Sequence, residues 1–371
     1  MKHYRSGALL VSLVLAVAAV ALAAGRVYNF KGGVKTRAEE GITKAQLAPQ
    51  SAPGLLFTWT YTFVYYLDDR ASGMIQYSYF KAGSTLFQRN LVHFSYASMD
   101  GERIYRKDII ANDQRLWQND PPMLTMGKHY WKGFYPDFNL HLDYGDVKAD
   151  LHCHCLTPGW RPGQGPTHYG APDGPWYDLI TMIPWAEVSG AITLPGKTLQ
   201  VHGNGYSDHN TQTVLFTSQI NHINALRSFG DEYAIHFLDY LAPPDLGSAR
   251  TTWILVMQKG KILYATDDYQ LKEFDMKNDP RRAYPYPTRM EVTINHPDCQ
   301  LHGTIKGLKL IEVLDVADET PGWARPVVTT FVTTPIFLRQ QADVDWLLKM
   351  PGQGIDASFT NRGIFEVCHV R

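Results

Sequence analysis

Residues 203–210 of this 371-residue chain read Gly-Asn-Gly-Tyr-Ser-Asp-His-Asn and place four proton-handling side chains within five positions. They are Tyr206, Asp208, His209 and Asn210. Glycine tolerates sharp backbone turns, so Gly203 and Gly205 allow the chain to bend here. Two interpretations follow. The segment is either a turn whose polar side chains bond their own backbone, or a catalytic cluster.

The catalytic interpretation requires Asp208 to lie in an apolar cavity. Burial would raise the pKa of its carboxyl and keep it protonated, as a general acid must be. Such an acid could protonate an alkene, and aromatic faces would stabilise the resulting carbocation. Tyr206 would assist Asp208, and His209 or Asn210 would hold the attacking water. On a regular strand Tyr206 and Asp208 share a face, whereas His209 joins them only at a bulge or turn.

Aromatic and imidazole side chains elsewhere are candidates for binding an apolar substrate. They are Trp59, Tyr61, Trp176, Trp185, His152 and His154. The two histidines alternate with Cys153 and Cys155, which resembles a metal site at first sight. On a strand, however, the histidines and cysteines face opposite ways and cannot converge. We therefore expect no metal, with the cysteines in the core and the histidines facing a cavity or water.

Motifs for other chemistries are absent from the sequence. It contains no G-x-S-x-G elbow, phosphate-binding loop or H-E-x-x-H motif, and no G-x-G-x-x-G ahead of a helix, so we expect no cofactor. The formal net charge is −1, and like charges do not cluster. This balance argues against a nucleic-acid partner.

The elements that would position these residues are short and strand-like. Segments in which two kinds of side chain alternate, as aromatic residues and threonines do at 55–66, recur along the chain. Gly, Pro, Asn and Asp separate these segments. A strand is also expected at 214–219 and another at 327–337, and helical periodicity is limited to 342–350 and 220–229. The pattern predicts an all-β fold of antiparallel sandwiches or barrels. A break near residues 185–195 would divide it into two domains.

The N-terminus resembles an export signal. Lys2 and Arg5 precede an apolar run at residues 8–24, with a small-x-small cleavage candidate at 21–23. We expect a secreted or periplasmic protein, and the alternative is an uncleaved membrane anchor that would give membrane association. Residues 26–54 are interpreted as a tether, and 158–176 as an aromatic lid.

The chain has four cysteines, too few for a disulfide scaffold. Cys299 and Cys368 could pair in an oxidising compartment. The equally weighted alternative is two buried thiols.

A family resemblance rests on three segments: Ile-Pro-Trp at 183–185, Val-Ser-Gly at 188–190, and the motif at 203–210. Weaker similarity runs from residues 58–66, through Leu116 and Trp117, to 363–367. These features resemble the two-domain lipocalin-like family of carotenoid 1,2-hydratase (hydroxyneurosporene synthase), AttH-type proteins, fungal kievitone hydratase and Diels–Alderases, and Svf1 proteins. After the asparagine, this chain has Thr211 and Gln212 where hydratases usually continue Trp-Gly.

The resemblance implies two lipocalin-like β-barrel domains with a pocket near their junction, and few short helices. Tyr206 and Asp208 match residues implicated in catalysis in hydratase members. The expected domains are a signal at 1–25, a tether at 26–54, and barrels at 55–190 and 191–371.

The expected function is binding of an isoprenoid- or polyene-like ligand, with cofactor-free hydration or cyclisation. The alternatives are a non-catalytic lipid carrier and an envelope interaction module. An Asp208 buried against aromatic side chains would favour the enzyme.

Overall fold

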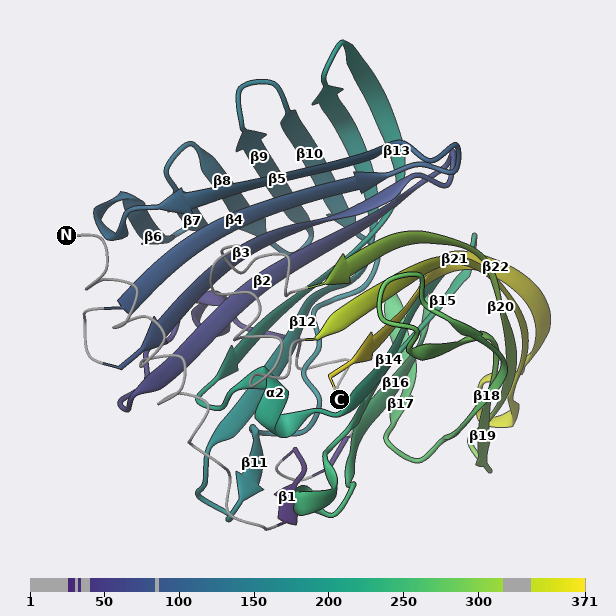
Figure 1. The fold of residues 1–371 in the computed structure, drawn as a ribbon. Helices are drawn as coiled ribbons and strands as arrows, with labels where there is room; N and C mark the ends of the chain where they lie inside the picture. Colours follow the sequence, from purple (N-terminus) through teal and green to yellow (C-terminus); the bar gives the residue numbers. More distant parts are fainter. Residues whose placement is uncertain (1–25, 31–32, 35–40, 84–86, 316–334, 371) are drawn as a thin grey trace.

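The computed structural model describes residues 26–30, 33–34, 41–83, 87–315 and 335–370. The expected export signal and most of the expected strand at 327–337 lie outside these residues. Within them, antiparallel strands dominate, which confirms the all-β prediction (Figure 1). No helix in this part of the chain is both long and apolar enough to cross a membrane.

The strands form two sheets, each curled around a core of its own (Figure 1). The first contains β1 (Arg26–Tyr28), β2 (Leu56–Leu67), β3 (Ser72–Ala82), β4 (Phe87–Ala97), β5 (Arg103–Ile110), β6 (Arg115–Asn119), β7 (Pro122–Met126), β8 (His129–Phe134), β9 (Asp137–Asp143), β10 (Lys148–Cys155), β11 (Thr167–Gly170), β12 (Trp176–Leu194) and β13 (Lys197–Gln212). Its main path is β5-β4-β3-β2-β13-β12-β10-β9-β8-β7-β6.

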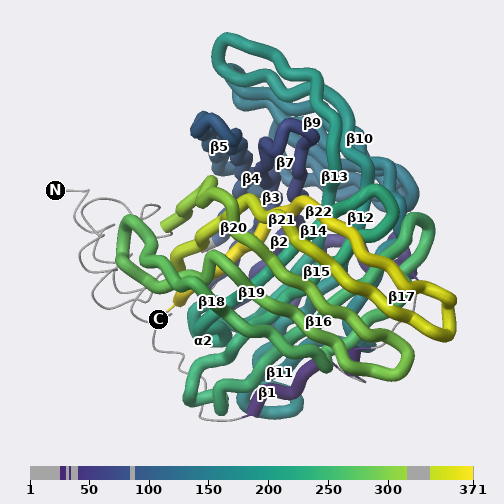
Figure 2. The backbone as a smooth tube through the Cα atoms, turned by 90° about the vertical axis from the view of Figure 1, so that its right-hand side faces the viewer, coloured from purple at the N-terminus to yellow at the C-terminus, as the bar shows by residue number. Residues whose placement is uncertain are grey.

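The second sheet runs across the front of the molecule in Figure 2, in the order β17-β16-β15-β14-β22-β21-β20-β19-β18. Its strands are β14 (His222–Phe229), β15 (Tyr233–Leu241), β16 (Arg250–Gln258), β17 (Lys261–Thr266), β18 (Gln270–Asn278), β19 (Pro285–His296), β20 (Cys299–Asp315), β21 (Ile336–Met350) and β22 (Ile355–His369). Among the described residues the helical pieces are single turns: η1 (Lys44–Leu47), η2 (Asn112–Gln114), α2 (Phe216–Gln219), η3 (Pro244–Leu246) and η5 (Pro351–Gln353).

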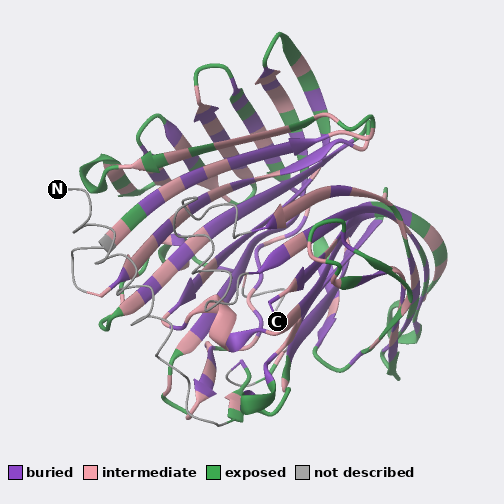
Figure 3. Ribbon diagram, in the orientation of Figure 1, coloured by how far each residue is buried: buried purple, intermediate pink, exposed green. Residues whose placement is uncertain are grey.

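A third apolar cluster lies between the sheets, and strands β2, β12 and β13 separate it from the first core. Alternate residues of β2 illustrate the division: Trp59 and Tyr61 pack in the first core, whereas Val64 and Tyr66 pack between the sheets. These strands are buried along most of their length (Figure 3). These three strands form a wall between the two apolar regions. Because side chains alternate across a strand, the wall contributes side chains to both of them.

Three local predictions are wrong. Residues 342–350 lie in β21 and 222–229 form β14, where helices were expected. In β21 the buried residues Ala342, Val344, Trp346, Leu348 and Met350 alternate with exposed or partly exposed ones, a strand period in a helix-forming composition. β14 is buried on both faces, which hides its period. Residues 216–219 form the helical turn α2 instead of a strand.

The segment boundaries also differ from expectation. Residue 190 lies inside β12, and the chain passes from the first sheet to the second between Gln212 and His222. The expected tether is partly built into the fold, since β1 pairs with β11 and Leu47 is fully buried. The expected lid is packed as well: Trp160 is buried and bonds Thr181 through their backbones.

All four cysteines are buried free thiols. Cys153 and Cys155 occupy the first core, as predicted. Cys299 lies in the second sheet's core and Cys368 between the sheets, so they do not form the disulfide considered above. Burial raises the pKa of Cys153 and of Cys299 to about 12. Buried thiols of this kind are chemically inert.

We therefore expect slow alkylation of native protein and modification of all four cysteines after unfolding without a reductant. Mass spectrometry of the alkylated chain measures both. A tryptic peptide pair joined through Cys299 and Cys368 would contradict this expectation.

Candidate functional site

The 203–210 segment is a regular part of β13 and forms no turn. Each residue from Gly203 to Gln212 pairs in unbroken register with β2. The irregularities lie in the partner strand β12, between Thr181 and Ala186. The turn interpretation is therefore wrong, and the alternation of a regular strand decides which side chains can act together.

The glycines serve close packing of strands. A Cβ on Gly203 would lie 2.2 Å from the carbonyl oxygen of Tyr66, and one on Gly205 would lie 2.6 Å from Val188 Cγ2. A backbone neighbour cannot move away as a side chain can. Gly203 therefore lets β13 lie tightly against β2.

Tyr206 and Asp208 point from β13 into the space between the two sheets. Tyr206 belongs to the cluster there, and Asp208 is 7% exposed. The Arg227 guanidinium, from β14, lies 4.8 Å from the centre of the Tyr206 ring. A pair of phenols is nearby, since the hydroxyls of Tyr177 and Tyr240 lie 3.3 Å apart. Burial raises the pKa of both, and the charge of Asp208 raises it further.

Burial raises the pKa of Asp208 to about 6. The positive charge of Arg227 and hydrogen bonds with Tyr206 and Asn210 oppose this rise. Asn210 thus interacts with the same carboxyl from two positions further along β13. The structure brings Tyr206, Asp208 and Asn210 together, as a regular strand requires.

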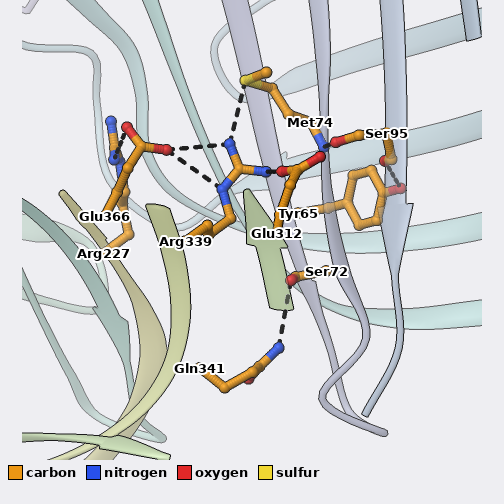
Figure 4. A network of polar contacts seen from close by, with 9 residues as sticks. All are labelled: Tyr65, Ser72, Met74, Ser95, Arg227, Glu312, Arg339, Gln341 and Glu366. Carbon is orange, nitrogen blue, oxygen red and sulfur yellow. Dashed lines mark hydrogen bonds and ion pairs between the residues drawn. The ribbon is translucent and has the colours of Figure 1, made fainter. Parts of the chain in front are cut away.

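A chain of buried charges extends this cluster through the second sheet (Figure 4). Arg227 lies 3.9 Å from Glu366, and Glu366 accepts a 3.1 Å hydrogen bond from Arg339. Arg339 also bonds Glu312 at 2.5 Å. Its Nη2 atom also contacts Met74 Sδ of the first sheet at 3.5 Å, so this network of second-sheet charges touches the first sheet.

Sequence reasoning did not identify Arg227, Glu366, Arg339 or Glu312 as site residues. Each lies on a different strand, so no local motif joins them. One available signal was Glu366, a carboxylate between the apolar residues of a closing strand.

His209 points the other way, into the first core. It is 1% exposed and stacks on Tyr61 with ring centroids 3.9 Å apart. Neither ring nitrogen has a hydrogen bond of standard geometry, and burial lowers the pKa to about 3 despite the Gln46 backbone. Since the strand has no bulge here, His209 cannot hold water beside Asp208.

The predicted substrate-binding residues are scattered. Trp59 and Tyr61 pack within the first core, where Trp59 also stacks on Tyr79. Trp185 lies between the sheets and donates to Asn204 Oδ1 at 2.9 Å. Trp176 is partly buried at the start of β12, against the first core. Of the four aromatic candidates, only Trp185 belongs to the same cluster as Tyr206.

His152 and His154 lie on the outer face of β10. Their side chains are 44% and 51% exposed, and both bond Asp137 Oδ1, at 3.0 and 2.9 Å. Of the two surroundings expected for them, a cavity or water, the structure shows water, and they do not join the Asp208 cluster, because inward positions of β10 are taken by residues such as Cys153 and Cys155. Across the described residues, no three His, Cys, Asp or Glu side chains are arranged to hold a metal.

The geometry supports recognition of a polar group by an otherwise apolar site. An ionisable carboxyl, a guanidinium and several phenols lie among the buried aromatic and aliphatic residues between the sheets. In such low-dielectric surroundings hydrogen bonds to charged groups are strong. With a pKa of about 6, Asp208 is mostly ionised at neutral pH.

The close approach at Gly203 is testable. Gly203→Ala should destabilise the protein by about 1–3 kcal/mol, because the new methyl group meets the backbone of β2. Gly352→Ala is the matched control, since a Cβ there has no neighbour within 4 Å. Urea unfolding of both variants measures the difference, and equal stabilities would refute this packing argument.

Asp208 should also make stability depend on pH. Its folded pKa of about 6 exceeds the ordinary 3.8, so the folded state binds the proton more tightly. Its contribution is therefore fully present below about pH 4 and is lost as pH rises through 6. Asp208→Asn removes this loss, so the stability of the variant relative to wild type should rise by roughly 2 kcal/mol between pH 4 and 7. Urea unfolding across that range measures it, and a constant difference would refute burial of an ionisable Asp208.

Comparison with known proteins gives related folds. The solved structures that resemble this chain include AttH from Nitrosomonas europaea, with 12% identity, a TM-score of 0.59, and coverage of 91% of this chain and 98% of that one. CghA with Sch210972 gives 12% identity, a TM-score of 0.61, and coverage of 93% and 98%. Kievitone hydratase from Nectria haematococca gives 11% identity, a TM-score of 0.54, and coverage of 93% and 98%. At these identities the likeness concerns the fold alone.

Sequence comparison identifies the family and confirms the predicted resemblance. The ceramide-binding protein SVF1 of Yarrowia lipolytica (strain CLIB 122 / E 150) is 24% identical over 238 residues, which cover 59% of this chain and 60% of that protein. The match thus spans less than two thirds of the relative. The model of the Svf1 family matches residues 58–365. The chain therefore belongs to the Svf1 family.

Proposed function

We propose that this protein binds an apolar lipid of the ceramide class and that the cluster around Asp208 holds the lipid's polar headgroup. The observation that carries the proposal is the buried group of Asp208, Tyr206 and Arg227 within the apolar cluster between the two sheets. The ceramide-binding relative from Yarrowia lipolytica supports this choice of ligand class.

The headgroup chemistry matches the cluster. A ceramide presents an amide and hydroxyl groups on two long apolar chains. An ionised Asp208 would accept hydrogen bonds from the amide N–H or a hydroxyl, and Arg227 or Tyr206 would donate to the carbonyl. Apolar residues between the sheets would contact the chains.

The interior of the first sheet suits this lipid less well. It is filled by its own aromatic and aliphatic side chains, most of them fully buried. A cavity beside Phe63, Ile75 and Leu151 measures about 10 Å³. That is room for about one water molecule. The residues between the sheets are buried to a similar degree, so the choice of that region as the ligand site rests on its polar cluster of Asp208, Tyr206 and Arg227.

Acid catalysis of hydration or cyclisation is the second candidate, favoured by the burial of Asp208 against Tyr206. A pKa of about 6 leaves only about a tenth of the carboxyls protonated at pH 7. The charge of Arg227 contributes to this value, because it opposes the effect of burial and favours the ionised form. An alkene needs a protonated acid, whereas an amide or hydroxyl needs an acceptor, so we rank lipid binding above catalysis. An isoprenoid or polyene substrate belongs to the catalytic candidate.

Export remains part of the proposal. Its basis is the sequence of residues 1–25, with Lys2 and Arg5 ahead of an apolar run. A secreted or periplasmic lipid carrier and a membrane-anchored one would both use this site. The envelope interaction module is less favoured, because a surface for protein partners would not require buried charges between the sheets.

Binding of a fluorescent short-chain ceramide tests the main proposal. At pH 7.5, Asp208→Asn should weaken binding about tenfold or more, because an amide is a weaker acceptor than a carboxylate. Asp150→Asn is the matched control: Asp150 is an exposed carboxylate of the first sheet and should leave affinity unchanged. Fluorescence titration measures both dissociation constants.

The same variant separates the two candidates. If the protein is an acid catalyst, the Asp208→Asn variant should still bind the ligand but form no product. If it is a carrier, the variant should lose affinity, and neither wild type nor variant should form product. Equal ceramide affinity of wild type, Asp208→Asn and Asp150→Asn would refute the headgroup site.

A further inference from the structure

Two indole N–H groups between the sheets lack an acceptor among the described residues. They belong to Trp160, which lies between β10 and β11, and Trp253 of β16, both members of the cluster that contains Tyr206. Trp160 is 1% exposed and Trp253 is 2% exposed, and their rings meet edge to face with centroids 5.4 Å apart. In the same cluster the indole of Trp185 does have a partner, Asn204.

The missing partner of each ring is a hydrogen-bond acceptor, because an indole nitrogen only donates. A buried donor without a partner is unfavourable, and tryptophan usually finds one when it is buried. A carbonyl oxygen has two lone pairs, so a single carbonyl of a bound molecule could accept from both rings.

Strand pairing places Trp160 in one row with Asp208. The backbones of Trp160 and Thr181 exchange two hydrogen bonds of 2.8 Å, and Thr181 of β12 is paired with Asp208 of β13. Directly paired residues point to the same side of a sheet, and neighbouring strands lie about 4.8 Å apart. The backbone of Trp160 is therefore about 10 Å from that of Asp208, on the same face. Between them, the hydroxyl of Thr181 interacts with Tyr206.

We propose that Trp160 and Trp253 donate their indole hydrogens to the amide carbonyl oxygen of the bound lipid, an inference that rests on the proposed ceramide-class function. The carboxylate of Asp208 only accepts, so it takes a hydroxyl or amide hydrogen of the same headgroup. With the indoles on the carbonyl, Arg227 and Tyr206 donate instead to hydroxyl oxygens. Donors and acceptors of the protein then match both kinds of polar group on the lipid.

This arrangement makes the site selective for an acylated lipid. A lipid with hydroxyl groups and no carbonyl leaves two buried donors unpaired, and sites built around a hydrogen bond discriminate strongly against ligands that lack it. Two other described indoles, those of Trp131 and Trp346, are also buried without an acceptor. They lie in the cores of the first and second sheets, outside the lipid site, and therefore serve as matched controls.

Titration of the full protein with a fluorescent short-chain ceramide at pH 7.5 tests the inference. Trp160→Phe and Trp253→Phe should each weaken binding about three- to tenfold, because phenylalanine keeps an aromatic ring and removes the donor. Trp131→Phe and Trp346→Phe remove the same group elsewhere and should leave the affinity unchanged. A fluorescent alkyl glycerol, which has hydroxyls and no carbonyl, should bind equally to wild type, Trp160→Phe and Trp253→Phe.

Nuclear magnetic resonance of the wild-type protein gives a second readout that needs no variant. In protein labelled with ¹⁵N-tryptophan, the short-chain ceramide should move two indole N–H resonances downfield, because both hydrogens gain an acceptor. The nuclear Overhauser effect between the two touching rings assigns these resonances to Trp160 and Trp253, even if a phenylalanine variant fails to fold.

Three results would overturn the inference: unchanged ceramide affinity in Trp160→Phe and Trp253→Phe, an equal loss in the two control variants, or an equal loss for the alkyl glycerol. Weaker ceramide binding by Asp208→Asn with unchanged binding by the Trp160 and Trp253 variants would retain the proposed function and refute this inference alone. Absence of ceramide binding to wild type would refute both.

Discussion

The wall formed by β2, β13 and β12 is the constraint on which the rest of the structure depends. Its strands are buried on both faces. A shift of one residue in strand register would therefore move the side chains of one apolar region into the other. Glycines at 203 and 205 allow the tight approach of β13, and unbroken pairing with β2 fixes its register. With this register, the side chain of Asp208 lies in the space between the sheets and that of His209 lies in the first core.

Burial of charge is the second constraint. Arg227, Glu366, Arg339 and Glu312 are contributed by four strands of the second sheet and lie largely out of water. Isolated ions in such surroundings would be strongly destabilising, so each is placed beside an opposite charge. This series of paired charges reaches Tyr206 and Asp208 through Arg227. The guanidinium of Arg227 opposes the effect of burial on the pKa of Asp208.

How much the sequence predicts follows from this arrangement. The aromatic alternation of β2 and the family motif predict an all-β fold and the pairing of Tyr206 with Asp208 on one face. Strands buried on both faces, such as β14, carry no alternation and were misjudged as helix. Arg227 and its partners are brought together by sheet order, which local sequence does not encode. His209 was misjudged because its neighbours suggested a bulge that β13 does not contain.

The charges of Asp208 and Arg227 decide between lipid binding and acid catalysis. An aspartate buried beside a phenol could serve either purpose, and its protonation state decides which. Here Arg227 of the second sheet keeps that carboxyl nearer the ionised form than burial alone would. Weakening this guanidinium's influence would raise the pKa of Asp208 further and convert an acceptor into an acid. The motif on β13 therefore does not determine function by itself, because burial and the charge of Arg227 on the second sheet both act on the proton affinity of Asp208.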